Sequence, residues 1–121
     1  MSETQEQLRP GEEILNHLYA VIQERKSHPS LDSHVSSLFA KGLDKILTKI
    51  GEEATETVIA GKGGKREEIV HESADLLFHL VVLLGFYNIS PDAVFGELRR
   101  RFGISGLEEK RRRNPVGKDE S

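Results

Sequence analysis

Four acidic residues occur as two pairs with the same spacing. Glu53 and Glu56 are three positions apart, and so are Glu72 and Asp75. On an α-helix, residues i and i+3 lie about 60° apart around the axis and about one turn apart along it. Each pair is therefore expected to direct two carboxylates to one side of its helix.

The segment between the two pairs predicts a helical hairpin. Gly61-Lys62-Gly63-Gly64 is expected to stop a helix, because glycine readily adopts the left-handed conformation of a helix C-cap. Two helices joined by so short a break fold back on each other antiparallel. The acids are placed symmetrically about the last glycine, so each is expected to stand level with a partner: Glu53 with Asp75, and Glu56 with Glu72.

Four carboxylates that converge in this way would repel one another and raise their own pKa values. A hard divalent cation that prefers oxygen ligands, Mg²⁺ or Mn²⁺, removes the conflict. The predicted metal ligands are Glu53, Glu56, Glu72 and Asp75. The alternative is that both pairs are ordinary solvated helix faces, whose acids interact weakly with nearby lysines.

Three neighbouring residues have two interpretations each. Lys49 is predicted on the flank that carries Glu53, where its ammonium either takes part in binding a phosphate group or forms a common i, i+4 helix pair with Glu53. Glu52 is predicted to face away from the core, either reaching a metal-bound water or only solvated. His79, four residues after Asp75, is either a packed core histidine or a residue that supports the ligands from behind.

The pattern of apolar residues predicts an all-α bundle of four to five helices. The expected helices cover about Pro10 to Lys26, Ser33 to Lys41, Leu43 to Ala60 and Lys65 to Asn88, with a further helix from Ser90-Pro91. Residues 76–86 are apolar nearly all round but too few to span a bilayer. Such a helix needs cover on every side, which predicts a homodimer that completes a larger bundle.

Composition excludes several classes of protein. The 121 residues predict one domain at 12–113, with a flexible segment at 1–11 and a disordered tail at 114–121. The net charge of -3 argues against a nucleic-acid binder driven by bulk electrostatics. No apolar run of membrane length and no signal peptide is recognised, so we expect a cytoplasmic protein without membrane partners. The absence of cysteine excludes disulfides and thiolate metal sites.

Glu52-Glu53-x-x-Glu56 followed by Glu72-x-x-Asp75 resembles the signature of the all-α, MazG-like nucleoside triphosphate pyrophosphohydrolases. Longer matches resemble one family among them, the phosphoribosyl-ATP pyrophosphohydrolases, over roughly residues 12 to 113. These matches are Leu38–Ile46, Lys49–Glu56, Glu72–His79 and Ser105–Lys110. His34 and His71 depart from the family pattern, which usually has tyrosine there.

The resemblance implies Mg²⁺-dependent hydrolysis of the α–β phosphoanhydride of 1-(5-phosphoribosyl)-ATP. The products would be 1-(5-phosphoribosyl)-AMP and pyrophosphate, in the second step of histidine biosynthesis. The four acids named above would hold the metal, and Glu52 or Glu53 would orient or deprotonate the attacking water. Lys49 and Lys62 are candidates for binding the departing pyrophosphate.

Two rival functions stay open at this point. One is a housecleaning dNTP pyrophosphohydrolase of the same superfamily. The other is a non-catalytic helical interaction module whose acids are only a solvated surface.

Overall fold

The computed structural model describes residues 10–103, and within them it contains five helices and no strand. These helices are α2 (Pro10–Ser27), α3 (His34–Lys41), α4 (Leu43–Gly63), α5 (Arg66–Phe86) and α6 (Pro91–Phe102). The predicted all-α class is confirmed. Residues 1–9 of the segment 1–11 that was expected to be flexible, the Ser105–Lys110 motif and the tail 114–121 lie outside the described residues, whereas Pro10 and Gly11 belong to α2.

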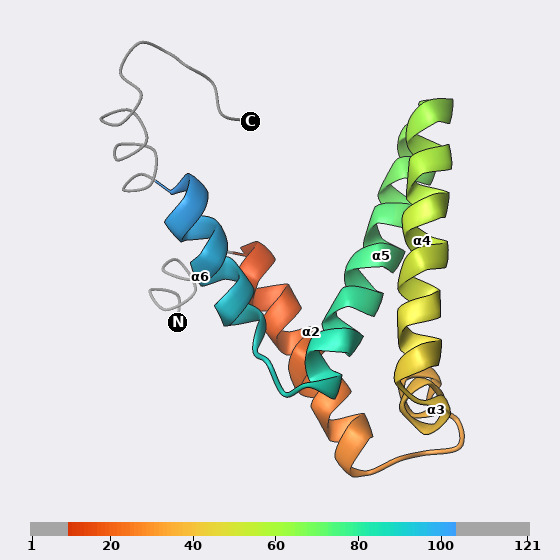
Figure 1. Ribbon diagram of the computed structural model, residues 1–121, viewed down its shortest axis with the longest axis vertical. Coiled ribbons are helices and arrows are strands. Elements are labelled where there is room, and N and C mark those ends of the chain that lie inside the picture. Colours follow the sequence, from red (N-terminus) through yellow and green to blue (C-terminus); the bar gives the residue numbers. More distant parts are fainter. Residues whose placement is uncertain (1–9, 104–121) are drawn as a thin grey trace. The chain divides into compact units, whose positions relative to one another are not determined.

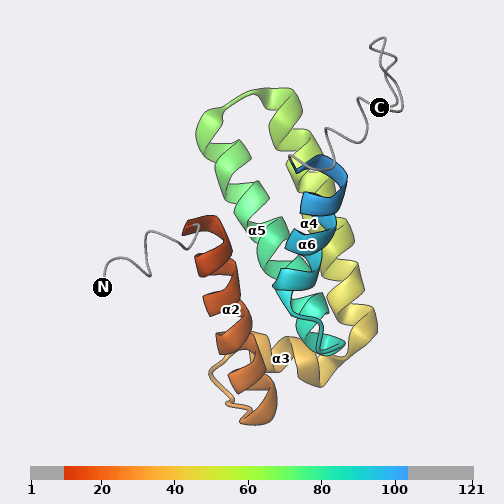
Figure 2. The ribbon, with the colours of Figure 1, turned by 90° about the vertical axis from the view of Figure 1, so that its left-hand side faces the viewer.

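The chain divides into two compact units, with the boundary in sequence after Pro91. The first unit contains α2 to α5. Its centre is the antiparallel hairpin of α4 and α5, which lie side by side along their length (Figures 1 and 2). Helix α2 packs against α5, and the short α3 packs against both α2 and α4.

The hairpin turns at Gly64, which has φ 81° and ψ 7°. The Gly64 N–H donates to the Ala60 carbonyl at 3.0 Å, as expected for a left-handed helix C-cap. The prediction that α4 ends at Ala60 is wrong by three residues, because Gly61 and Gly63 both keep helical geometry. Glycine lowers helix propensity but breaks a helix only where its backbone leaves the helical region. Lys62 consequently lies in the last turn of α4 and not in a loop.

Helix α3 begins one residue later than expected, because Ser33 is its N-cap and not its first helical residue. The Ser33 hydroxyl accepts a hydrogen bond from the Ser36 N–H at 3.1 Å, which satisfies one of the free donors of the first turn. The helix ends at Gly42, with φ 98°. This short helix closes one end of the hairpin and completes the core.

The core of the first unit is aliphatic and small. Its buried members come from all four helices of this unit: Ile22, Val35, Leu38, Ile46, Val81 and Val82. Helices α2 and α5 approach each other closely at Gly85, where an added Cβ would lie 2.8 Å from Ile22 Cγ2. Lys26 strengthens the same contact, since its Nζ donates to the Gly85 carbonyl at 2.8 Å near the C-terminus of α5.

Helix α5 is the one described helix long and apolar enough to cross a membrane by length and composition. From the sequence, no membrane-spanning helix was expected. In the first unit, α5 packs along α4 and against α2, and a core helix of a soluble protein passes the same test. Apolar side chains nevertheless remain exposed on the hairpin: Val58, Ile59, Val70, Leu77 and Leu80.

Helix α6, in the second unit, carries an acid and two arginines that pair within the helix. Glu97 accepts from Arg101 Nε at 2.7 Å and is also hydrogen-bonded by Arg100. These two arginines lower the pKa of Glu97 to about 2.

Candidate metal and catalytic site

Helices α4 and α5 bring three carboxylates together. Glu53 and Glu56 project from α4 and Glu72 from α5, and one oxygen of each lies within 4.8 Å of the others. We call these residues the hairpin triad. Glu56 and Glu72 meet across the hairpin, in the register that symmetry about Gly64 predicts. Three carboxylate oxygens at this separation are suited to a cation with oxygen preference.

A hydroxyl group ties the two helices at the level of the triad. Thr57 Oγ1 lies 2.8 Å from the Glu53 carbonyl and 3.3 Å from the Glu72 carbonyl, so it has acceptors on both helices. Because Thr57 lies on α4 between the triad and the turn, it fixes the spacing of the backbones that carry the ligands. The geometry of the triad thus rests on a polar contact as well as on apolar packing.

Two triad oxygens have no hydrogen-bond partner among the described residues. Glu53 is buried, with 8% of its surface exposed, and its Oε1 atom has no donor. The Oε1 atom of Glu72 is likewise buried and unpaired. A buried carboxylate oxygen without a donor is costly, since it has lost water and gained nothing in exchange. A bound cation would satisfy both atoms, so the residues fit a divalent metal ion.

Burial and, after it, neighbouring negative charge raise the pKa of the Glu72 carboxyl. Burial raises this pKa above its ordinary value of 4.5, and the charge of Glu56 and a hydrogen bond with it raise it further. The nearby His71 acts in the opposite direction, and the charge of Glu53 adds to the increase. The repulsion expected from converging acids is therefore present in the structure.

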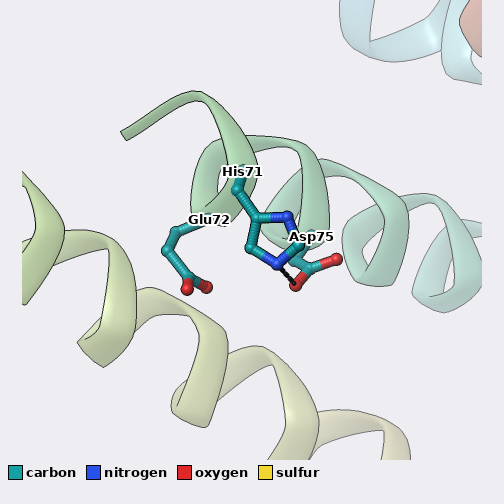
Figure 3. A group of neighbouring side chains, drawn as sticks. All are labelled: His71, Glu72 and Asp75. Atoms are coloured by element: carbon teal, nitrogen blue, oxygen red, sulfur yellow. Dashed lines mark ion pairs between the residues drawn. The ribbon is translucent and has the colours of Figure 1, made fainter. Parts of the chain in front are cut away.

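Asp75, the fourth predicted ligand, belongs to a second group. One atom each of His71, Glu72 and Asp75 lies within 4.8 Å of the others. His71 Nε2 lies 3.4 Å from Asp75 Oδ2, and Figure 3 shows Glu72 extending from α5 toward α4 beside this pair. The predicted ligands thus form two groups that overlap at Glu72, not the single four-carboxylate cluster that the symmetric register implied. Asp75 has a short side chain and its carboxylate is turned to His71, one turn earlier on the same helix.

Lys49 and Glu52 lie beside the triad. Lys49 Nζ is 3.3 Å from Glu52 Oε1 and 3.9 Å from Glu53 Oε2, so it bridges an exposed acid and a buried one. The Glu52 side chain is 53% exposed and belongs to neither group of potential ligands. Both interpretations of Lys49 remain compatible with this position, because it is a helix pair that also touches a predicted ligand.

Neither Lys62 nor His79 belongs to the hairpin triad, and the two residues differ in exposure. Lys62 is exposed in the last turn of α4. His79 is buried, and its Nδ1 donates to the Asp75 backbone carbonyl at 2.8 Å, not to the Asp75 carboxylate. Its ring packs edge-on against Phe78, and its Nε2 atom has no partner among the described residues. The histidine therefore contacts the backbone behind the second group.

One acidic residue of the site was not singled out from the sequence. Glu68 lines a cavity of about 230 Å³ together with Glu56, Ile59, Ala60 and Glu72. Glu68 precedes Glu72 by four residues, so the i, i+4 rule applied one turn earlier on α5 would have found it. The cavity gives the triad an opening toward the turn of the hairpin.

Known proteins resemble this chain along most of its length. A model of the family "Phosphoribosyl-ATP pyrophosphohydrolase" matches residues 15–102. A phosphoribosyl-ATP pyrophosphatase of Geotalea daltonii is 61% identical over 104 residues, which are 86% of this chain and 98% of that protein. Proteins of the same name from Geobacter sulfurreducens and Methylococcus capsulatus are 62% and 55% identical, over 85% and 81% of this chain and 95% and 93% of their own lengths.

Proposed function

Since the chain belongs to the phosphoribosyl-ATP pyrophosphohydrolase family and is a hydrolase, we propose that it cleaves the α–β phosphoanhydride of 1-(5-phosphoribosyl)-ATP with the aid of Mg²⁺. The products are pyrophosphate and 1-(5-phosphoribosyl)-AMP, in the second step of histidine biosynthesis. The observation that carries the proposal is the pair of buried, unpartnered carboxylate oxygens on facing helices, Glu53 Oε1 and Glu72 Oε1.

The hairpin triad and Asp75 are the proposed metal ligands. Carboxylate oxygens from α4 and α5 suit Mg²⁺, with Mn²⁺ as a possible substitute. When bound, such an ion neutralises phosphate charge and lowers the pKa of a bound water. The role of the chain is to hold the carboxylates at fixed spacing, which Thr57 and the packing of the hairpin achieve.

Glu52 and Glu53 have different proposed tasks. A cation beside a carboxylate lowers its pKa and makes it a poorer base. Glu53, buried and short of donors, therefore suits the ligand role. Glu52 lies one residue away, stays open to solvent and is outside the ligand groups, so it is the better acceptor for the proton of the attacking water.

The two lysines are the proposed contacts for pyrophosphate, and His79 is the proposed positioning residue for a ligand. Lys49 offers an ammonium group next to Glu52 and Glu53, where it can bind an oxygen of the departing pyrophosphate. Lys62, at the turn end of α4, is the second proposed contact for pyrophosphate. His79 acts through Asp75, since its hydrogen bond to the Asp75 carbonyl holds that turn of α5 in place.

We also propose a cytoplasmic homodimer. The exposed apolar side chains of the hairpin occur on both helices, with Val58 70% exposed on α4 and Leu77 48% exposed on α5. A second copy of the chain would cover this surface and complete a larger bundle. Sedimentation of a monomer at micromolar concentration would contradict the dimer.

The proposed activity is tested by pyrophosphate release from phosphoribosyl-ATP, with Mg²⁺ and with EDTA. We expect release with Mg²⁺ alone, and much slower release from dUTP and dCTP under the same conditions. Faster hydrolysis of the dNTPs would assign the chain to the housecleaning relatives. No release from any of these substrates, with Mg²⁺ bound, would favour the non-catalytic interaction module.

A further inference from the structure

A cavity separate from the one that Glu68 lines lies between the α2–α3 connection and α5. Its volume is about 360 Å³, and its walls come from α2, the connection, the start of α3 and α5, all within the first unit. The polar and aromatic residues that line it are Arg25, Ser30, Asp32, Ser33, His34 and Phe78. None of the triad residues is among its lining, so the cavity offers room for a ligand group away from the carboxylates.

A buried serine fixes the walls of this cavity. Ser36 is 6% exposed, and its hydroxyl donates to the Arg25 carbonyl at 3.3 Å and accepts from the Ser30 N–H at 3.0 Å. The Ser30 hydroxyl in turn accepts from the Asp32 N–H at 3.2 Å. Satisfied networks of this kind make a structure rigid. The backbones that carry Arg25 and Asp32 are therefore held in place before any ligand binds.

Two side chains of opposite charge line the cavity and suit different parts of one ligand. The Arg25 guanidinium donates one hydrogen bond to Glu24 at 2.8 Å, but a guanidinium has five N–H donors, so it can also bind a phosphate group. Asp32 is exposed, and a carboxylate accepts hydrogen bonds from the hydroxyls of a ribose. A phosphate group alone would be repelled by Asp32, whereas a phosphorylated sugar provides a partner for both side chains.

Aromatic side chains connect the cavity to the proposed metal site. The rings of His34 and Phe78 are stacked, with centroids 6.0 Å apart and planes inclined by 19°. Phe78 follows the proposed ligand Asp75 by three residues on α5, which is about one helical turn. A purine ring on this aromatic surface would lie about one turn from that ligand, so a single substrate molecule can reach both places.

We propose that this cavity binds the phosphoribosyl group that distinguishes 1-(5-phosphoribosyl)-ATP from ATP. Arg25 binds its phosphate, Asp32 accepts from its ribose hydroxyls, and the aromatic pair lies beside the purine. The inference rests on the proposed function, which supplies the substrate. It goes further by naming residues that recognise a group remote from the bond that is cleaved. Arg25 and Asp32 are thus specificity-determining residues that do not contact the reacting atoms.

The test compares the binding of 1-(5-phosphoribosyl)-AMP and AMP to the full chain by titration calorimetry in EDTA. The two compounds differ only in the phosphoribosyl group. We expect 1-(5-phosphoribosyl)-AMP to bind at least about tenfold more tightly, the scale of a charge-assisted hydrogen bond, and Arg25→Gln to bring the two affinities close together. Asp32→Asn, an exposed change, should also reduce the difference. The matched control is Arg66→Gln, an exposed arginine at the start of α5, which should keep the whole difference.

Kinetics with Mg²⁺ separate this inference from the proposed function. Arg25→Gln should lower kcat/KM for 1-(5-phosphoribosyl)-ATP by about tenfold or more, mainly through a higher KM, with unchanged helicity by circular dichroism. Equal affinities of the unmodified chain for the two monophosphates, or a difference that survives both Arg25→Gln and Asp32→Asn, would overturn the cavity assignment and leave the proposed function intact. Binding that depends on Arg25, without hydrolysis of 1-(5-phosphoribosyl)-ATP, would support the cavity assignment and overturn the proposed function.

Discussion

Glu56 on α4 and Glu72 on α5 lie close enough across the hairpin to share a hydrogen bond when one of them holds a proton. This contact joins residues 16 positions apart in sequence into one site. It also means that the metal-free hairpin holds like charges close together, a cost in free energy that a bound cation would remove. Binding of the proposed cation is therefore expected to stabilise the fold.

The first prediction concerns how the stability of the metal-free chain depends on pH. A carboxyl whose pKa is raised by folding binds its proton more tightly in the folded state, so it favours folding at low pH. That contribution is lost as pH rises through the raised pKa of Glu72. In EDTA we expect the melting temperature of Glu72→Gln to exceed that of the unmodified chain by a margin that grows as pH rises from about 4.5 to neutrality. Thermal melts of both proteins across this range measure the difference.

The control for this prediction is Glu13→Gln, an exposed change in the first turn of α2. Its melting temperature should show no comparable growth with pH. A constant difference between Glu72→Gln and the unmodified chain over the whole range would show that Glu72 is not crowded by its neighbours.

The second prediction concerns the proposed ligands. We expect Glu56→Gln and Asp75→Asn to reduce kcat for phosphoribosyl-ATP by at least about 100-fold, because each removes a charge that orients a cation. Helicity by circular dichroism should be unchanged, since Glu56 is exposed and the Asp75 side chain is 42% exposed. Near-normal turnover of either variant at saturating Mg²⁺ would remove that residue from the ligand set.

The third prediction separates the two interpretations of Lys49. If its ammonium binds phosphate oxygens, Lys49→Ala should lower kcat/KM by about tenfold or more, the scale of a lost charge-assisted hydrogen bond. If it serves only the helix pair with Glu52, stability should change by no more than about 0.5 kcal/mol and kcat/KM should stay the same. Steady-state kinetics with Lys45→Ala, another lysine of α4, as control distinguishes the two outcomes.

The fourth prediction concerns the contact between α2 and α5. An added Cβ at Gly85 would meet Ile22 Cγ2 at 2.8 Å, so Gly85→Ala should destabilise the fold by about 1–3 kcal/mol through overpacking. The matched control is Gly51→Ala on α4, where no neighbouring atom lies within 4 Å. That change should stabilise by about 0.5–1 kcal/mol, because alanine is the better helix former. Urea unfolding measures both, and equal effects would contradict the close approach.

The sequence was sufficient for the helices and the hairpin, because their signals are local. Apolar periodicity and the glycine-rich segment 61–64 indicated where the helices run and where the hairpin turns, and the structure places that turn at Gly64. The end of α4 was misjudged because a glycine shows only that a helix is able to stop there. Which glycine takes a positive φ depends on how the two helices pack.

The site was less predictable than the fold. Spacing showed which acids share a face, and the meeting of Glu56 with Glu72 followed from symmetry about the turn. It did not show that Asp75 turns to His71, because rotamers and side-chain length lie outside any helical-wheel argument. The burial of Glu53 and the direction of the His79 hydrogen bond likewise depend on tertiary packing.

The central claim is that α4 and α5 form a divalent-cation site, and thermal unfolding of the metal-free chain in increasing Mg²⁺ tests it most directly. A ligand that binds only the folded state stabilises it by about 2.7 kcal/mol at one hundred times its Kd. We predict a melting temperature that climbs with Mg²⁺ concentration, and a much smaller rise in Glu53→Gln. Equal melting temperatures with and without millimolar Mg²⁺ would contradict the claim.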